Sequence, residues 1–397
     1  WIATFLRLIL RYRGGIMNDA VLIFMFSPIQ PFIAEARRTS DLYAASKILS
    51  TLARAVGEYL QSQGDLIYPA KIGDDVPNKL VVQVPWDQAS KIAEHAESVL
   101  EQTWQKEART AMGFFKDKNL LPFSSAHQDE WRKIWKRQIH DFWEHYWAAA
   151  KVKEGKYQEA YTEANRALEA AKRTRSFAPK QESGLKDTLS GRRSALRTKD
   201  LNGREYWIQI AQSPAVFNAR LRPDGRERLD AIGLVKRFGG IGMERGASFP
   251  STSSIASTWF LEAARGKPEL EHYRKTVETL LGGHLHKVEK KDPDWPYDGD
   301  LFYKEELDPK RLHNSYGIEE SKISEEALTQ AKQKLAVLLK AYPVPLDRYY
   351  AILVFDGDNM GKHIAACQGK SDHQNLSEMI GQFAANVEEI VEKPSCR

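Results

Sequence analysis

Two aspartates, Asp356 and Asp358, flank Gly357 directly after an apolar run in "YYAILVFDGDNMGKHI" (residues 349–364). Carboxylates that follow a strand are exposed at the sheet edge but rigidly held, so two of them one residue apart can share a divalent ion. The glycine lets the backbone turn and lets its carbonyl approach the metal. The motif alone leaves four interpretations open: a palm-type nucleotidyltransferase, a phosphatase with an aspartyl nucleophile, a structural cation site and a solvated turn. A phosphatase would need Thr or Val soon after the second aspartate, where the sequence has "NMGK".

Other motifs that carry chemistry are missing from the sequence. Its 397 residues contain no P-loop, no G-x-G-x-x-G after a strand and no G-x-S-x-G. His284 and His286 form a pair, but no carboxylate or cysteine nearby would complete a metal site. Cys367 and Cys396 are too few for a disulfide framework or a four-cysteine zinc site, and they fit a reducing cytoplasm.

The net charge of +5 is mild, but it is unevenly distributed. Residues 172–237 hold 16 Lys and Arg against 7 Asp and Glu, a local net charge of +9. Such a segment suits an RNA backbone or an acidic face of another subunit, and it is equally compatible with a solvated, Arg-rich loop region. The leader "WIATFLRLILRYRGG" contains no apolar run long enough to span a membrane, and it lacks the small-residue cleavage site of a signal peptide.

The first part of the chain predicts the elements of a small α+β domain. Val21–Phe26 reads as a buried strand, and a long helical stripe runs from Phe32 to Leu60. Two strands at Leu66–Tyr68 and Leu80–Val84 and a helix over Gln88–Ala111 follow. The order strand, helix, strand, strand, helix is the core of a ferredoxin-like or palm domain.

The rest of the chain reads as mostly helical. Five apolar residues between Ile139 and Trp147 fall on one helical face, a stripe typical of core packing. Strands are predicted at Tyr206–Ala211 and Tyr349–Phe355. The sequence predicts further helices at about Lys156–Arg175, Ser254–Leu281, Glu325–Ala341 (with Ser324 as N-cap) and Leu376–Glu392.

Five segments, taken together and in this order, resemble the large, polymerase/cyclase-like subunit of type III CRISPR effector complexes of the Cmr type. The resemblance runs through almost the whole chain from about residue 21. The segments are "FMFSPIQPFIAEARRTSDLYAASKILSTLA", "PNKLVVQVP", "QIHDFWEHYWAAA", "FPSTSSIA" and "YYAILVFDGDNMGK".

The chain departs from this family in three places. The family normally holds a zinc ion with two Cys-x-x-Cys pairs, but Asp187 and Ser190 stand at the first pair and Asp230 and Gly233 at the second. We therefore expect the module without zinc and held by its own packing, since a structural zinc would otherwise stabilise it. The N-terminal His-Asp nuclease domain and the Gly-Gly-Asp-Asp hairpin are not found in the sequence.

The resemblance implies metal-dependent nucleotidyl transfer, in which ATP is converted to cyclic oligoadenylates when target RNA binds. Asp356 and Asp358 would be the catalytic carboxylates, and together with the Gly357 carbonyl they would hold Mg²⁺ or Mn²⁺. Ser27, Pro28 and Gln30 match the nucleotide-facing loop of the first palm domain, although the family usually has glycine in place of Ser27. For Gln30 a helix-capping role is the alternative. The implied partners are the other complex subunits, CRISPR RNA and target RNA through the complex, and ATP, with no membrane.

The expected fold is α+β: a ferredoxin-like palm domain with a helical and degenerate zinc-module insertion, a helical domain, and the first strand and helix of a second palm domain. Two functions remain open, an active cyclase whose other motifs lie outside this sequence and a non-catalytic, nucleotide-binding scaffold. A diguanylate-cyclase-like protein is disfavoured by the long helical and basic insertions. A partial second palm should expose the apolar face of its last helix. The expected segments are 1–16 (a leader), 17–125 (first palm), 126–247 (insertion), 248–345 (helical domain) and 346–397 (second palm).

Overall fold

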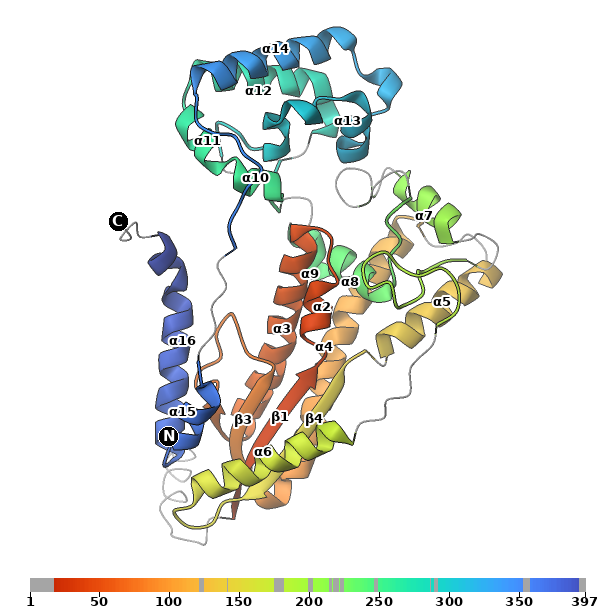
Figure 1. Cartoon of the computed structure of the whole chain (residues 1–397). Helices are drawn as coiled ribbons and strands as arrows, with labels where there is room; N and C mark the ends of the chain where they lie inside the picture. The colour runs from red at the N-terminus through yellow and green to blue at the C-terminus, as the bar shows by residue number, and fades with distance from the viewer. Residues whose placement is uncertain are drawn as a thin grey trace, which may run out of the picture.

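The structure is a computed structural model of the chain, and it is of the mixed α+β class, mostly helical with one four-stranded antiparallel sheet (Figure 1). The residues it describes are 18–120, 125–140, 142–174, 182–198, 203–213, 216, 221, 225–245, 249–285, 287–288, 292–352 and 358–392.

The sheet has the strand order β2-β3-β1-β4, with every neighbouring pair antiparallel. The central strand pairs along its length with both neighbours, so that Val21 lies opposite Gln83 on one side and Ala150 on the other. The four strands are β1 (Asp19–Ser27), β2 (Asp65–Tyr68), β3 (Lys79–Pro85) and β4 (Glu144–Lys151).

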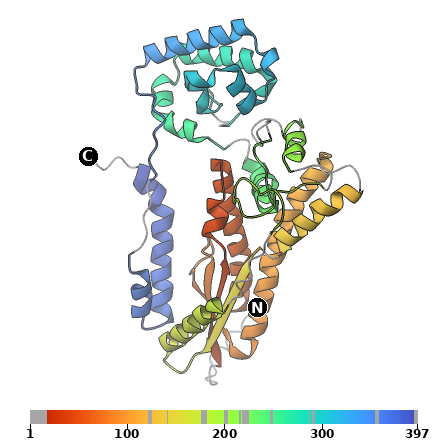
Figure 2. The ribbon, with the colours of Figure 1, turned by 45° about the vertical axis from the view of Figure 1, so that its right-hand side comes forward.

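Helices cover both faces of this sheet (Figures 1 and 2). Side chains alternate along a strand, so Leu22, Phe24 and Phe26 of β1 face a core shared with α3 (Thr39–Gln63) and α4 (Ala89–Asp117). Val21 and Ile23 face the opposite core, which α6 (Tyr157–Arg173) covers. Burial on both faces explains why β1 is an unbroken apolar run.

The core on the α3–α4 face continues into the helices of the predicted insertion. Trp131, Trp207 and Phe238 are fully buried in it. These helices are short, and they join the same hydrophobic cluster rather than forming a core of their own. They are α5 (Ser125–His140), α7 (Gly203–Ala211), α8 (Ala231–Phe238) and α9 (Gly240–Arg245). Phe32 of the short helix α2 (Gln30–Ala34), from the first part of the chain, joins the same cluster, and the 3₁₀ turn η1 (Trp86–Gln88) precedes α4.

A second helical core lies between residues 260 and 346, where α12 packs against α14. Ser324 caps α14 by accepting a hydrogen bond from Ala327 N, as predicted. The range Ser254–Leu281, predicted to be mostly helical, holds α11, α12 and most of α10. The elements of this part are α10 (Thr252–Ala256), α11 (Thr258–Ala264), α12 (Pro268–Leu281), α13 (Pro309–Tyr316), α14 (Glu325–Ala341) and the 3₁₀ turns η3 (Gly282–His284), η4 (Gly299–Phe302), η5 (Lys304–Glu306) and η6 (Glu320–Lys322).

The last two helices, α15 (Met360–Ala366) and α16 (Lys370–Glu392), lie beside the sheet and not beside the second helical core (Figure 1). α16 lies beside the edge strand β2. Gln374 Nε2 donates to the carbonyl of Leu66 at 2.8 Å, and Ala70 N donates to Ser377 Oγ at 2.8 Å. The last helix is therefore attached to the sheet edge by polar contacts.

Three predictions of local structure are wrong. Tyr206–Ala211 is part of helix α7, because its buried residues recur at helical spacing, a period that a six-residue apolar run does not reveal. The helix predicted through Trp147 ends at His140, and the aromatic residues that follow enter strand β4. Tyr349–Ile352 is irregular rather than strand, and the rest of that predicted strand lies outside the described residues. The predicted role in core packing is confirmed, since the Trp143 ring lies 5.6 Å from the ring of Phe26.

Candidate functional site

Asp358 is the described member of the carboxylate pair, while Asp356 and Gly357 lie outside the described residues. It is exposed and precedes Asn359, whose left-handed backbone (φ 55°) starts helix α15. Its side chain makes no hydrogen bond or ion pair with any described residue. Carboxylate and carbonyl oxygens are the donors that Mg²⁺ and Mn²⁺ prefer, so the donor set of residues 356–358 fits such an ion. The described residues alone contain no group of three or more His, Cys, Asp or Glu that could hold a metal.

Ser27, Pro28 and Gln30 lie together at the carboxyl end of β1 and the start of α2. Ser27 Oγ lies 3.4 Å from Glu144 Oε2, and the Ser27–Pro28 peptide is cis. Gln30 is exposed, and no side chain caps the start of α2. The capping role considered for Gln30 is therefore wrong, and its side chain is available to a ligand.

The structure does not bring these two sets together within its described part. Ser27 lies where β1 ends, whereas α15 packs against α6 and α16 against β2 (Figure 1). Gln158 of α6 donates to the carbonyl of Ala365 at 3.2 Å. This bond holds α15 beside α6, the helix that covers the Val21 and Ile23 face of the sheet.

Two further carboxylates, Asp74 and Asp75, lie in the β2–β3 loop at the same end of the sheet as Ser27. Asn78, also in this loop, donates to the carbonyl of Phe26 at 2.9 Å, which fixes the loop beside the end of β1. Asp74 pairs with Arg54 at 2.8 Å and Asp75 with Lys47 at 3.4 Å, both cations coming from α3. Neither aspartate was predicted as a site residue, although "IGDD" lies within a loop between two predicted strands.

A buried histidine anchors the start of α16. His373 is 1% exposed, and its Nδ1 lies 2.9 Å from the hydroxyl of Tyr157. The ring also stacks near Tyr68 and meets Tyr161 edge-on. Burial, helped by the charge of Lys79, lowers the pKa of His373 to about 4. The imidazole is therefore neutral at pH 7 and acts as an aromatic packing group.

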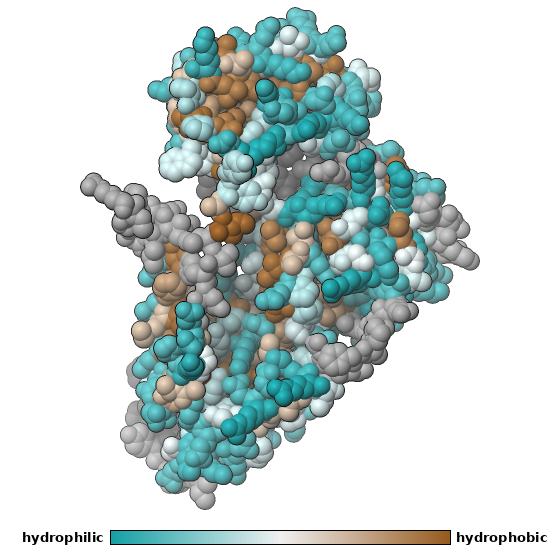
Figure 3. Space-filling view, in the orientation of Figure 1, coloured by the Kyte–Doolittle hydropathy of each residue, from teal (hydrophilic) through white to brown (hydrophobic). Residues whose placement is uncertain are grey.

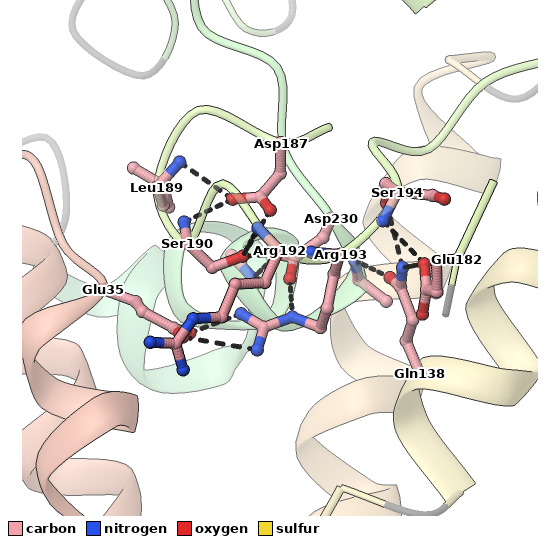
Figure 4. A network of polar contacts seen from close by, with 12 residues as sticks. Glu35, Gln138, Glu182, Asp187, Leu189, Ser190, Arg192, Arg193, Ser194 and Asp230 are labelled. Atoms are coloured by element: carbon pink, nitrogen blue, oxygen red, sulfur yellow. Dashed lines mark hydrogen bonds and ion pairs between the residues drawn. The ribbon is translucent and has the colours of Figure 1, made fainter. Parts of the chain in front are cut away.

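The four positions that the sequence analysis matched to zinc ligands lie in a polar network (Figure 4). Asp187 Oδ1 accepts hydrogen bonds from the backbone of Leu189 at 2.8 Å and of Ser190 at 2.6 Å. Asp230 caps α8 by accepting from Gly233 N at 2.6 Å. None of these residues supplies a thiolate, so the set does not fit a zinc site of the cysteine type.

Arg193 links this network to α2 (Figure 4). Its guanidinium forms ion pairs with Asp230, which is fully buried, and with Glu35 at the end of α2. It also lies over the ring of Phe142, 5.6 Å from the centroid. The arginine thus joins the start of α8 to the end of α2.

Replacing Arg193 with methionine is expected to lower the free energy of unfolding by about 2 to 3 kcal/mol, because it leaves the buried Asp230 carboxylate without its cation. Urea unfolding measures the difference. Arg192→Met is the matched control: this exposed neighbour forms no such pair, so little change is expected. Equal losses in the two variants would contradict the assigned role of Arg193.

Part of the basic charge in residues 172–237 is buried. Lys236 is 1% exposed, and its ammonium donates to the carbonyls of Phe32 and Glu35, both at 2.6 Å. Burial lowers the pKa of Lys236 to about 8. Arg237 is also buried and pairs with Asp41 and Glu227. These cations hold α8 against α2 and α3, and because they are buried they cannot contact an external RNA or protein.

An apolar surface runs along α16 (Figure 3). Met379 is 66% exposed and Phe383 54%, in agreement with the predicted exposure of an apolar face on this helix. Tyr349 and Ile352, just before the aspartates, are 87% and 75% exposed. Within the described residues, no helix has the length and apolar character needed to cross a membrane.

Two protein-family models match the chain. One, described as CRISPR-associated protein Cmr2, N-terminal, covers residues 21–76, and the other, Cas10/Cmr2, second palm domain, covers residues 349–396. The second match contains the aspartate pair.

The chain is also similar to a curated protein, CRISPR system Cmr subunit Cmr2 of Pyrococcus furiosus. The two are 22% identical over 447 residues, covering 96% of this chain and 48% of that protein. The chain therefore spans about half the length of this relative.

Among solved structures, the fold resembles a chain of type III-B Cmr-beta in its apo state, with a TM-score of 0.50 and 13% identity, covering 94% of this chain and 48% of that one. A chain of Cmr-beta bound to cognate target RNA matches with a TM-score of 0.45 and 13% identity, over 98% and 50% of the two chains.

Proposed function

Because this chain belongs to the Cas10/Cmr2 large subunits of type III-B Cmr complexes, we propose that it contributes to ATP-dependent synthesis of cyclic oligoadenylates when the complex binds target RNA. The observation that carries the proposal is Asp358, which is exposed and without a protein partner among the described residues, inside the second-palm match. A carboxylate in that state is available to bind a substrate-associated cation.

In this proposal Asp356, Asp358 and the Gly357 carbonyl would hold Mg²⁺ or Mn²⁺. The ion would supply charge stabilisation at the transferring phosphate of ATP. Asn359 contributes by its left-handed backbone, which ends the aspartate loop and starts α15 directly after Asp358. No zinc is part of the proposed function.

The sheet and helices α3 and α4 would form a first, ferredoxin-like palm domain within residues 17–125. Its fourth strand, β4, comes from the following segment, 126–247, whose remainder would be the helical and zinc-free insertion. Residues 248–345 would be the helical domain and 346–397 the first part of the second palm. Ser27, Pro28 and Gln30, at the end of β1, would face a nucleotide in the first palm domain.

The proposed partners are the other subunits of the effector complex, and CRISPR RNA and target RNA through that complex, in the cytoplasm. Support comes from the Cmr2 relative and from the fold likeness to a chain of type III-B Cmr-beta.

A non-catalytic, nucleotide-binding scaffold is the second candidate. It is favoured because no hydrogen bond or ion pair among the described residues links Asp358 with the Ser27–Gln30 turn. A scaffold would need only one of these sets to bind nucleotide.

The test is incubation of the assembled effector complex, containing this protein at full length, with ATP, Mg²⁺ and target RNA. Chromatography should detect oligoadenylates and pyrophosphate that depend on target RNA. If an intact, RNA-bound complex yields neither product, the catalytic proposal fails and the scaffold function stands.

A further inference from the structure

Two successive residues at the start of α6 bind the two helices that follow the aspartates. The Tyr157 hydroxyl lies 2.9 Å from Nδ1 of His373, near the start of α16. Gln158 Nε2 donates to the carbonyl of Ala365 at 3.2 Å and lies 3.5 Å from that of Ile364, at the end of α15. The last carbonyls of a helix have no partner within the helix, and Gln158 supplies one from outside. Neighbouring side chains of α6 therefore hold both helices.

The contact between Tyr157 and His373 is buried. His373 is 1% exposed and Tyr157 6%, and the imidazole meets the Tyr161 ring edge-on, with the two centroids 4.9 Å apart. A buried polar atom that loses its partner costs free energy, because water cannot take the partner's place. The contact therefore favours this placement of α16 over others.

Polar contacts rather than apolar packing place α15 and α16 in the described part of the chain. Of the apolar side chains described there, Ile364 is the one that packs against the hydrophobic core of the sheet, whereas Met379 and Phe383 are more than half exposed. Gln374 and Ser377 add hydrogen bonds to β2 and to the loop after it. Hydrogen bonds have preferred directions, so they define a position more narrowly than apolar contact does.

Helix α15 connects this placement to Asp358. Its seven residues span about 10 Å, and it begins directly after Asn359, the left-handed residue that follows Asp358. The backbone nitrogens of Lys362 and His363 both donate to the carbonyl of Asn359, at 2.7 and 3.2 Å. Asn359 is thereby joined to the first turn of the helix. A displacement at the end of α15 consequently also moves Asp358.

We infer that Tyr157, Gln158 and His373 are positioning residues, which hold Asp358 at a fixed place beside the first part of the chain. The inference rests on the proposed function, in which Asp358 binds a divalent cation, and it assigns the support of that ligand to α6. Groups of a functional site have to be held within about 0.5 Å of their working geometry. The three side chains do not touch the cation in this assignment, and they act through α15 and α16.

Hydrogen exchange of the full-length protein tests the placement itself. His373→Leu removes the ring nitrogen that faces Tyr157, whereas His373→Asn keeps a polar atom near the position of Nδ1. The amides of α15 should exchange at least about tenfold faster in His373→Leu, because a buried hydrogen bond is lost, and at the wild-type rate in His373→Asn. His272→Leu, which alters an exposed histidine of α12, is the matched control and should leave this exchange unchanged.

Mn²⁺ binding to the same proteins, followed by electron paramagnetic resonance without ATP, tests the link to Asp358. His373→Leu should raise the Kd about tenfold, as loss of a group that supports a metal ligand does, while His373→Asn and His272→Leu should stay within about twofold of the wild type. Circular dichroism checks that each variant is folded at the temperature of the titration. A loss of stability alone would lower the folded fraction but not the affinity of the folded protein.

Two results would overturn the inference. One is exchange of α15 at the same rate in His373→Leu and the wild type. The other is faster exchange with no change in Mn²⁺ affinity, which would leave the three residues a purely structural role. Asp356→Asn/Asp358→Asn is the reference: if this variant binds Mn²⁺ like the wild type, the proposed metal site fails, while the exchange result still decides whether α6 holds α15. The two proposals are therefore separable.

Discussion

Replacing Asp356 and Asp358 with asparagine is expected to lower oligoadenylate synthesis by the assembled complex at least about 100-fold. Asparagine keeps the size of the side chain but removes the charge that favours a divalent cation. Loss of groups that only support a metal ligand already costs about 10- to 100-fold, so loss of the ligands themselves should cost more. The rate of product formation at saturating ATP and target RNA measures the effect.

The matched control is Asp347→Asn, which removes one exposed carboxylate shortly before the motif. This variant should keep full activity, and all variants should assemble normally, because the Asp358 side chain makes no hydrogen bond or ion pair with a described residue. If the double variant retains activity within a few-fold of the unaltered protein, the aspartates are not the metal ligands.

Replacing Arg237 with methionine is expected to lower the free energy of unfolding by about 3 to 5 kcal/mol, the usual cost of removing one partner from a buried ion pair. Arg237 Nε donates to Asp41 Oδ1 at 3.0 Å, and another of its nitrogens lies 3.0 Å from Glu227 Oε1. Both carboxylates are 1% exposed. The variant removes the cation that both buried carboxylates share, while Arg38 remains paired to Glu227 at 3.2 Å.

Urea unfolding at pH 7 measures this loss, and Arg54→Met serves as the control. The Arg54–Asp74 pair is exposed, so its removal should cost less than about 1 kcal/mol. Similar losses in the two variants would show that burial does not strengthen the Arg237 network.

The loss in Arg237→Met is also expected to depend on pH. Burial alone would raise the pKa of Asp41, but the charge and hydrogen bond of Arg237 outweigh it and hold that pKa below the ordinary value of 3.8. Without Arg237, burial prevails and the pKa rises, so the variant gains stability as pH falls through the raised pKa. In the wild type, ionised Asp41 keeps its contribution to the free energy of unfolding down to about pH 3.8, the ordinary pKa of the group. The difference between the two proteins should therefore narrow from pH 7 to about 4.5, and a constant difference would contradict this assignment.

The buried cations are a part of the molecule that could not be predicted from the sequence, because distant segments bury them. The excess of cations in residues 172–237 is visible in the sequence, but their burial is not. Lys236 and Arg237 reach carbonyls and carboxylates of α2 and α3 that lie about two hundred positions earlier. A pairing at that separation leaves no local pattern, so a solvated face and a buried network look identical in composition.

A pocket between α6 and α15, open to solvent, could not be predicted from the sequence for the same reason. Arg166 and Arg173 have an ordinary spacing for the solvated face of a helix. Only the fold brings Lys79, from the sheet, and Ile364, from the segment after the aspartates, to the same wall. The sequence showed charged residues on a helix, and the tertiary structure decided that they line a pocket.

The sequence by itself determined the features that depend on neighbours along the chain. The apolar run of β1, the order of the strands and helices in residues 19–117 and the Ser324 cap of α14 follow from local periodicity and hydrogen bonding. The tertiary structure decided between helix and strand where short aromatic runs fit both, as in α7 and β4, because burial against distant segments outweighs local propensity there. It also decided that Arg193, Asp230 and Glu35, which lie far apart in the sequence, form an ion network.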